Sequence, residues 1–149
     1  MVTGVVNGRS QIIEDAPVEG TPYWEDLWII SPDEPLGHAP GDADTELEPA
    51  PGAARWRVFL VPPDAVLREL MGEHGATSDD GVTVDDAFFH LTNTVDLIYV
   101  LDGDVTLRME EGEVLLHPGD CVVQRNTNHA WGNPSDQPVR LLGLMVGLP

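Results

Sequence analysis

The sequence predicts an all-β fold, a barrel or sandwich, with one short helix. Short runs rich in β-branched and aromatic residues recur along the chain, and Gly/Pro turns separate them. An Asn-Gly dipeptide between apolar runs near the start indicates a β-hairpin. Between residues 89 and 133, polar side chains recur at every second position, which places them on one face of a strand.

The first half of the chain alternates strands with loops. Residues 1–15 are expected to form a hairpin around Asn7-Gly8, because both turn residues need positive φ. A Pro/Gly loop follows, and then a strand over 23–30. Residues 31–53, rich in Pro, Gly and acids, are expected to be loop, either a lid or a mobile surface segment. His38 within it is expected to be solvated.

A strand and the single helix come next. Residues 55–61 read as a strand that Pro62-Pro63 ends. The helix is predicted over 64–73, within an insertion of about residues 63–75, because Pro63 and Asp64 suit a first helical turn. His74 would then lie at the helix C-terminus, where a cation offsets the dipole.

The second half is predicted to be strand throughout. The apolar runs are 97–101, 105–109, 114–116, 121–124 and 139–146, with turns at 102–104, 111–112 and 117–120. Cys121, the single cysteine, lies in one of these runs. We expect it to be a buried structural thiol rather than a nucleophile.

Composition limits the class of protein. The 149 residues are expected to form one domain, with N-terminal strands over 1–30 and the core motifs over 89–133. A net charge of −19 argues against nucleic acid and membrane partners. We find no apolar run of membrane-spanning length and no signal peptide, and one cysteine fits a reducing cytoplasm. Without a phosphate loop or dinucleotide fingerprint, no nucleotide cofactor is expected.

Two histidines and a carboxylate form the candidate site. Strand periodicity predicts that His90 and Asp96 point into one cavity from one strand and that His129 reaches it from another. Such a set suffices for Zn²⁺, Fe²⁺ or Mn²⁺ with open coordination positions. The alternative is a buried hydrogen-bonded pair, His90 with Asp96, that holds strands in register.

Further side chains are candidates for binding substrate. Arg57 either holds a substrate carboxylate or forms a surface ion pair. Thr92, Gln124 and Trp131 are expected on the cavity wall, although threonine also simply suits strands and Trp131 also suits a core. In the neighbouring loops, Asn133 is expected to cap its turn and Arg125 to lie at the surface.

The chain resembles the cupins. His90, Asp96 and Gly103 follow the spacing of the first cupin motif, and His129 with Asn133 follows the end of the second. A small subgroup of cupins also shows strings similar to 92–96 (TNTVD), 123–125 (VQR) and 129–131 (HAW) and to the N-terminal segments 2–8 and 26–28. The resemblance implies a double-stranded β-helix, or jelly roll, over nearly the whole chain.

The departures from the cupin motifs concern the metal. The resemblance implies a metal site of three histidines and a glutamate, but Thr92 replaces one histidine and Asp96 replaces the glutamate. Gln124 and Asn126 stand where the second motif has proline and glycine. His90, Asp96 and His129 are the remaining candidate ligands, and the Gln124 amide oxygen could assist a harder metal.

The predicted function is an enzyme of lyase or isomerase type. Dehydration, decarboxylation or isomerisation of an oxygen-rich acid, polyketide-like or aromatic metabolite needs an acid/base group and a stabiliser of negative charge. His90 or His129 would move the proton, and Asp96 would orient a histidine or bind metal. The alternatives are a non-haem iron dioxygenase and a non-catalytic ligand-binding cupin. We also expect a homodimer, because the hairpin over 2–13 has a free edge.

Overall fold

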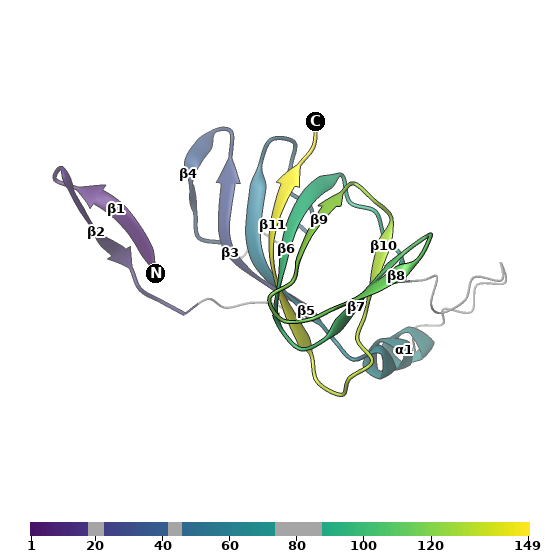
Figure 1. The fold of residues 1–149 in the computed structure, drawn as a ribbon. Coiled ribbons are helices and arrows are strands. Elements are labelled where there is room, and N and C mark those ends of the chain that lie inside the picture. Colours follow the sequence, from purple (N-terminus) through teal and green to yellow (C-terminus); the bar gives the residue numbers. More distant parts are fainter. Residues whose placement is uncertain (18–22, 42–45, 74–87) are drawn as a thin grey trace.

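Two antiparallel sheets face each other and form a β-barrel in the computed structural model, which describes residues 1–17, 23–41, 46–73 and 88–149 (Figure 1). The larger sheet has the strand order β4-β3-β5-β11-β6-β9, and the smaller one β10-β7-β8. The barrel strands are β3 (Trp24–Ser31), β4 (Glu34–His38), β5 (Ala54–Val61), β6 (Thr94–Asp102), β7 (Val105–Met109), β8 (Glu113–Leu116), β9 (Cys121–Arg125), β10 (His129–Gly132) and β11 (Val139–Gly147). The predicted all-β class is confirmed.

The N-terminal hairpin forms as predicted. β1 (Val2–Val6) pairs antiparallel with β2 (Arg9–Glu14), and the turn residues Asn7 and Gly8 have φ of 53° and 72°. Positive φ at both positions is what an Asn-Gly turn provides. Figure 1 draws this hairpin apart from the barrel, and its apolar side chains Val5 and Ile12 are exposed.

Strand β4 contradicts the expectation that residues 31–53 are all loop. Glu34–His38 pairs with β3 at the edge of the larger sheet. Pro35 and Gly37 hide this strand in the sequence, but an edge strand tolerates proline because its outer side needs no donor. His38 lies on β4, half-buried, with Nδ1 2.8 Å from Glu34 Oε2, rather than free in a loop.

Helix α1 (Asp64–Glu73) has the predicted bounds, and His74 lies outside the described residues. The first turn is fixed to the loop after β10, because Asn133 N donates to Asp64 Oδ1 at 2.6 Å and Asp64 N donates to Asn133 O at 2.8 Å. Asn133 also caps its own turn as predicted, accepting from Ser135 N and Oγ at its side-chain oxygen. No helix of the described residues is long and apolar enough to cross a membrane.

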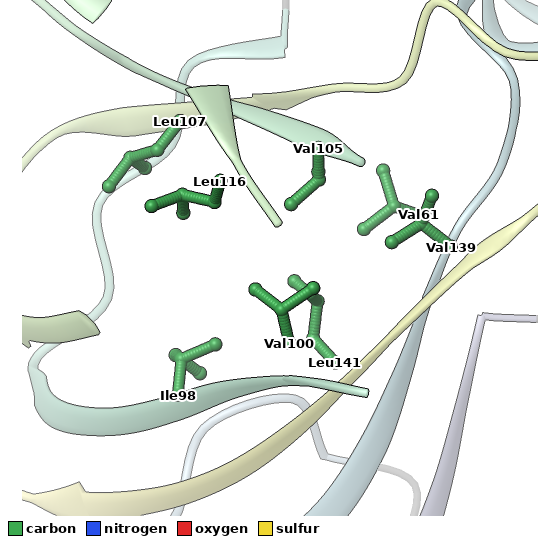
Figure 2. Packing of buried hydrophobic residues seen from close by; sticks show 8 residues of the cluster. All are labelled: Val61, Ile98, Val100, Val105, Leu107, Leu116, Val139 and Leu141. Carbon is green, nitrogen blue, oxygen red and sulfur yellow. The ribbon is translucent and has the colours of Figure 1, made fainter. Parts of the chain in front are cut away.

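The apolar core lies between the two sheets at one end of the barrel. Strand β11 lies between β5 and β6, and alternate residues of β6 and β11 point inward. Figure 2 shows the buried cluster, which consists of Val61, Ile98, Val100, Val105, Leu107, Leu116, Val139 and Leu141. The polar end of β6 therefore lies next to this apolar core.

Cys121 is exposed, so the prediction of a buried thiol is wrong. It begins β9, an edge strand of the larger sheet, on which Gln124 faces inward and is buried. Because side chains alternate along a strand, Cys121 and Val123 then face outward. The apolar run had suggested burial without indicating which face of the strand lies inside.

Candidate active site

A cavity of about 320 Å³ lies inside the barrel, beside the apolar core. Sheet strands β3, β5, β6, β9, β10 and β11 line it, together with helix α1 and the segment before β6. Six of the predicted site residues meet there: His90, Thr92, Asp96, Gln124, His129 and Trp131. This volume is within the range of small-molecule sites in proteins.

The two histidines form one pair across the smaller sheet. His90 N donates to His129 O at 2.9 Å, His129 N donates to His90 O at 3.0 Å, and the ring centroids are 4.3 Å apart. The expectation that His90 and Asp96 share one strand is wrong, because β6 begins at Thr94 and the chain bends at Asn93. The bend takes the chain from one sheet to the other, so the two side chains meet from opposite walls.

Backbone carbonyls fix the tautomers of both histidines. His129 Nδ1 lies 2.8 Å from Thr127 O, and His90 Nδ1 lies 3.1 Å from Phe88 O. A carbonyl only accepts, so Nδ1 carries the proton in each hydrogen bond. In the neutral rings Nε2 is then the free acceptor, which is the atom that a general base or a metal ligand uses.

The two histidines differ in exposure. His90 is exposed and lies at the mouth of the cavity, whereas the side chain of His129 lies inside, with 3% of its residue surface exposed. Burial lowers the pKa of His129 to about 4, the His90 charge lowers it further, and the hydrogen bond to Thr127 opposes the shift. His129 is therefore neutral at pH 7.

Asp96 and Gln124 are buried polar side chains with unused hydrogen-bonding atoms. They are cross-strand partners on β6 and β9, and they are 5% and 4% exposed. Among the described residues, Asp96 Oδ1 and Gln124 Nε2 have no hydrogen-bond partner. Burial raises the pKa of Asp96, against a hydrogen bond from Thr94 and the charges of His90 and Arg57. Such unpaired groups are costly in a core, and both line the cavity.

Thr92 and Trp131 also line the cavity, Thr92 beside these polar groups and Trp131 beside His129. Thr92 Oγ1 lies 2.7 Å from Thr94 Oγ1, so a hydroxyl chain leads from the cavity wall toward Asp96. Trp131 is half-buried, packs against the apolar core, and meets the His129 ring edge-on at 6.1 Å between centroids. Trp131 therefore belongs to both the core and the cavity wall.

Arg57 lies behind the cavity wall, neither on it nor at the surface. It is fully buried and binds the Asp26 carboxylate through Nε at 2.7 Å and Nη2 at 3.0 Å. Nη1 donates to Leu47 O at 2.8 Å, and Nη2 also lies 3.3 Å from Glu46 O. Burial lowers the pKa of Arg57, although Asp26 holds the guanidinium charged. These contacts fix residues 46 and 47 of the long loop against the barrel.

The aromatic wall was missed by the sequence analysis. Trp24, Phe59 and Phe88 line the cavity, and the Arg57 guanidinium lies 5.3 Å from the Trp24 ring centroid and 5.6 Å from that of Phe59. Phe59 fits because Gly143, two residues along β11 from its cross-strand partner Leu141, has no side chain: a Cβ there would lie 2.5 Å from the Phe59 ring. Asp26, which lies in a strand between Trp24 and Trp28, was the available signal for the buried ion pair behind this wall.

A comparison with protein families supports the resemblance. Residues 82–147, less than half of the chain, match the family model described as Cupin domain (Cupin_2). Residues 82–147 are therefore similar to cupin domains, as the motif spacing predicted. His90, Asp96 and His129 all lie within this segment.

The curated relatives described here come from fungi. This chain is 38% identical over 78 residues to "Oryzines biosynthesis cluster protein J" of Aspergillus oryzae. The aligned residues cover 52% of this chain and 38% of that protein. This chain is 43% identical over 51 residues to "Phomopsin biosynthesis cluster protein C'" of Diaporthe leptostromiformis, covering 34% and 27%. The chain thus matches well under half the length of either relative.

Among solved structures, this chain is similar to TT1209 from Thermus thermophilus. The TM-score is 0.43 and the sequence identity 21%, over 64% of this chain and 74% of that one. At this level the likeness carries no functional conclusion.

The cupin metal site is only partly matched by these residues. Two imidazole nitrogens and a carboxylate oxygen have suitable donor chemistry for a divalent metal. Among the described residues, however, no group of three or more His, Cys, Asp or Glu side chains is arranged to hold a metal ion. The predicted ligand set of His90, Asp96 and His129 therefore stays a prediction, and the chemistry below is derived from the side chains alone.

Proposed function

We propose that this cupin is a lyase or isomerase that moves a proton on a small organic molecule bound in the barrel cavity. One observation carries the proposal: the buried Asp96 carboxyl, which has an oxygen without a partner among the described residues, lines the same cavity as the buried neutral imidazole of His129. Pairs of titratable groups whose environments separate their protonation behaviour are characteristic of acid/base sites.

The roles follow from the protonation of each group. His129 Nε2 accepts a proton from the carbon next to a substrate carbonyl, because its Nδ1 is committed to Thr127. Asp96, whose burial favours the neutral acid, donates its proton to a departing hydroxyl group. The C–H and C–O bonds break, a C=C bond and water form, and the proton on His129 returns to Asp96 through solvent. For isomerisation, the proton returns to another carbon instead.

The other cavity residues would bind and orient the substrate. Among the described residues Gln124 Nε2 has no partner, so it can donate to the same substrate oxygen that Asp96 protonates, and the Thr92 hydroxyl also lines the cavity. Trp131 offers an aromatic surface beside His129. His90, at the mouth, is the second candidate for the proton transfer.

The relatives support a metabolic role. Both fungal relatives are named as biosynthesis cluster proteins, and on that basis we propose a small-molecule metabolite as substrate.

We further propose a cytoplasmic homodimer, in which the apolar hairpin residues Val5 and Ile12 contact the second copy. Their exposure in a single copy supports this assembly.

A solvent-exchange experiment tests the proposed reaction. Purified protein is incubated in D₂O with a panel of β-hydroxy ketones, cyclic ketones and β-keto acids, and mass spectrometry follows deuterium gain, water loss and CO₂ loss. We expect water loss or deuterium gain with at least one compound, at a rate reduced about 10²-fold or more in His129→Gln. His117→Gln is the matched control, because His117 is exposed and pairs with Asp104 outside the cavity.

A chelator separates the metal-dependent alternatives. The proposed chemistry should be unchanged after dialysis against EDTA, whereas a lyase or dioxygenase that needs a divalent metal should lose activity and regain it with Fe²⁺, Mn²⁺ or Zn²⁺. Equal rates in wild type and His129→Gln would contradict the proposed role of His129. Ligand binding without any turnover would favour a non-catalytic binding cupin.

A further inference from the structure

The cavity has a long apolar side and a short polar side. Aromatic and aliphatic side chains form most of its wall, among them Trp24, Phe59, Ile98 and Leu141. The polar side consists of His90, Thr92, Asp96, Gln124 and His129. No lysine or arginine is among the described residues that line it. The charge that a ligand could meet therefore comes from Asp96 and the histidines.

The nearest buried cations are already engaged. Arg57 binds Asp26 through two of its nitrogens and the carbonyls of residues 46 and 47 through Nη1 and Nη2. Arg55 Nη1 lies 3.1 Å from Asp26 Oδ2. Neither arginine lines the cavity. A ligand carboxylate could reach Arg57 only by displacing the Trp24 and Phe59 rings and breaking a buried ion pair.

A carboxylate bound elsewhere in the cavity would be poorly compensated. It would lose its hydration against an apolar wall and would lie beside the Asp96 carboxyl. A neutral oxygen suits the site better, because Asp96 and Gln124 are cross-strand partners whose Oδ1 and Nε2 atoms have no hydrogen-bond partner among the described residues. A single hydroxyl can donate to a carboxyl oxygen and accept from an amide N–H.

We infer that the cavity takes an uncharged, largely aromatic or aliphatic molecule that presents one hydroxyl or carbonyl oxygen to Asp96 and Gln124. This inference rests on the proposed function for its statement that the bound molecule is the substrate. It narrows that function: a neutral hydroxy ketone or enolisable ketone fits, so dehydration or isomerisation is favoured over decarboxylation, whose substrate carries a carboxylate. The expected oxygen-rich acid is accordingly replaced by an apolar, oxygen-poor substrate.

Calorimetric titration with a matched pair of compounds tests the inference. The probes are 1-naphthol, neutral at pH 7, and 1-naphthoate, which has the same ring system and an ionised carboxylate. We expect wild-type protein to bind 1-naphthol at least about tenfold more tightly than 1-naphthoate. Comparable binding of both, tighter binding of the naphthoate, or binding of neither by folded protein would overturn the inference.

A second test of the inference introduces a positive charge into the cavity wall. Leu67 lines the cavity from helix α1 and is half-buried, so Leu67→Arg adds the cation that the wall lacks, and Leu67→Gln is the uncharged control. We expect Leu67→Arg alone to gain affinity for 1-naphthoate, with circular dichroism confirming that both variants are folded. If both variants change naphthoate binding equally, the missing cation does not set the preference. If 1-naphthol binds as expected but the D₂O panel gives no turnover, the ligand class stands and the enzymatic proposal fails.

Discussion

The two ends of the barrel are built from the same strands but hold opposite chemistry. Along β6, the inward residues Ile98 and Val100 enter the apolar core, whereas Thr94 and Asp96 belong to the polar group at the cavity. At the filled end, Val100 and Val105 have no exposed surface and pack against other aliphatic side chains (Figure 2). At the hollow end, a carboxyl oxygen and an amide nitrogen are buried without partners among the described residues.

The difference between the ends separates stability from function. Close packing of aliphatic side chains stabilises the fold, while unsatisfied buried polar groups reduce stability and persist where a ligand uses them. The barrel therefore concentrates its stabilising contacts at one end and its chemistry at the other. Four measurements test this comparison, ordered by the expected effect on the free energy of unfolding.

The largest effect on the free energy of unfolding is expected from replacing two buried aspartates, Asp26 and Asp96, each of which has 5% of its surface exposed. Asp26 is paired with Arg55 and Arg57, so Asp26→Leu should lower the free energy of unfolding by about 3–5 kcal/mol, because the fully buried Arg57 guanidinium loses its carboxylate. Asp96 is unpaired at Oδ1, so Asp96→Leu should raise the free energy of unfolding by about 1–2 kcal/mol. Urea denaturation measures both.

For Asp96→Leu, catalytic activity and stability should change in opposite directions. Asp96→Leu should lose about 10²-fold or more of any D₂O exchange activity while unfolding at higher urea. A destabilised Asp96→Leu protein would mean that Asp96 has structural partners and would remove the contrast with Asp26.

Much of the barrel could be predicted from local pattern. The Asn7-Gly8 hairpin, the helix over 64–73 and the strand over 105–109 each depend on neighbouring residues, and each was correctly predicted. Strand β4 could not be predicted, because Pro35 and Gly37 have low strand propensity and only pairing with β3 makes them a strand.

The site was predictable only where motif spacing reached it. His90, Asp96 and His129 were placed at one cavity, but the bend at Asn93 that puts His90 on the other sheet is a tertiary feature. The Arg57 guanidinium behind the aromatic wall is paired with Asp26, which is 31 residues away in sequence. Local periodicity cannot determine such pairings.

The second effect compares leucines at the two ends. Leu107 lies in the filled core, so Leu107→Ala should cost about 2–5 kcal/mol through lost burial and a residual cavity. Leu67 borders the open cavity and is half-buried, so Leu67→Ala should cost only roughly 1 kcal/mol. Equal losses in thermal or urea unfolding would show that the hollow end is packed as tightly as the core.

The third effect is a pH dependence located at the hollow end. The pKa of His129 falls from 6.5 to about 4 in the folded protein, so the unfolded chain binds more protons between these values. Stability should therefore fall as pH drops from about 6.5 toward 4, by up to about 3 kcal/mol. The raised pKa of Asp96 acts oppositely, since protonation of its folded form is favoured.

A variant isolates the histidine contribution from that of its titratable neighbours, His90 and Asp96. In His129→Gln the free energy of unfolding should decline less between pH 6.5 and 4 than in wild type, whereas Asp96 contributes to both proteins alike. Parallel pH profiles for the two proteins would show that His129 titrates normally and is accessible to solvent in the folded state.

The smallest effect on barrel stability is expected from the hairpin, which stands apart from both ends in Figure 1. Val5 is 71% exposed on β1, and Leu36 is 88% exposed on β4, so a lysine at either position should change the free energy of unfolding of the barrel by less than about 0.5 kcal/mol.

The effects of these two lysine substitutions on assembly should differ. If the hairpin joins two copies, wild type and Leu36→Lys should both give twice the 16.2 kDa chain mass by light scattering, and Val5→Lys should give the single-chain mass at micromolar concentration. A wild-type mass of one chain would exclude the dimer at that concentration, and a dimer that survives Val5→Lys would place the contact away from this face of the hairpin.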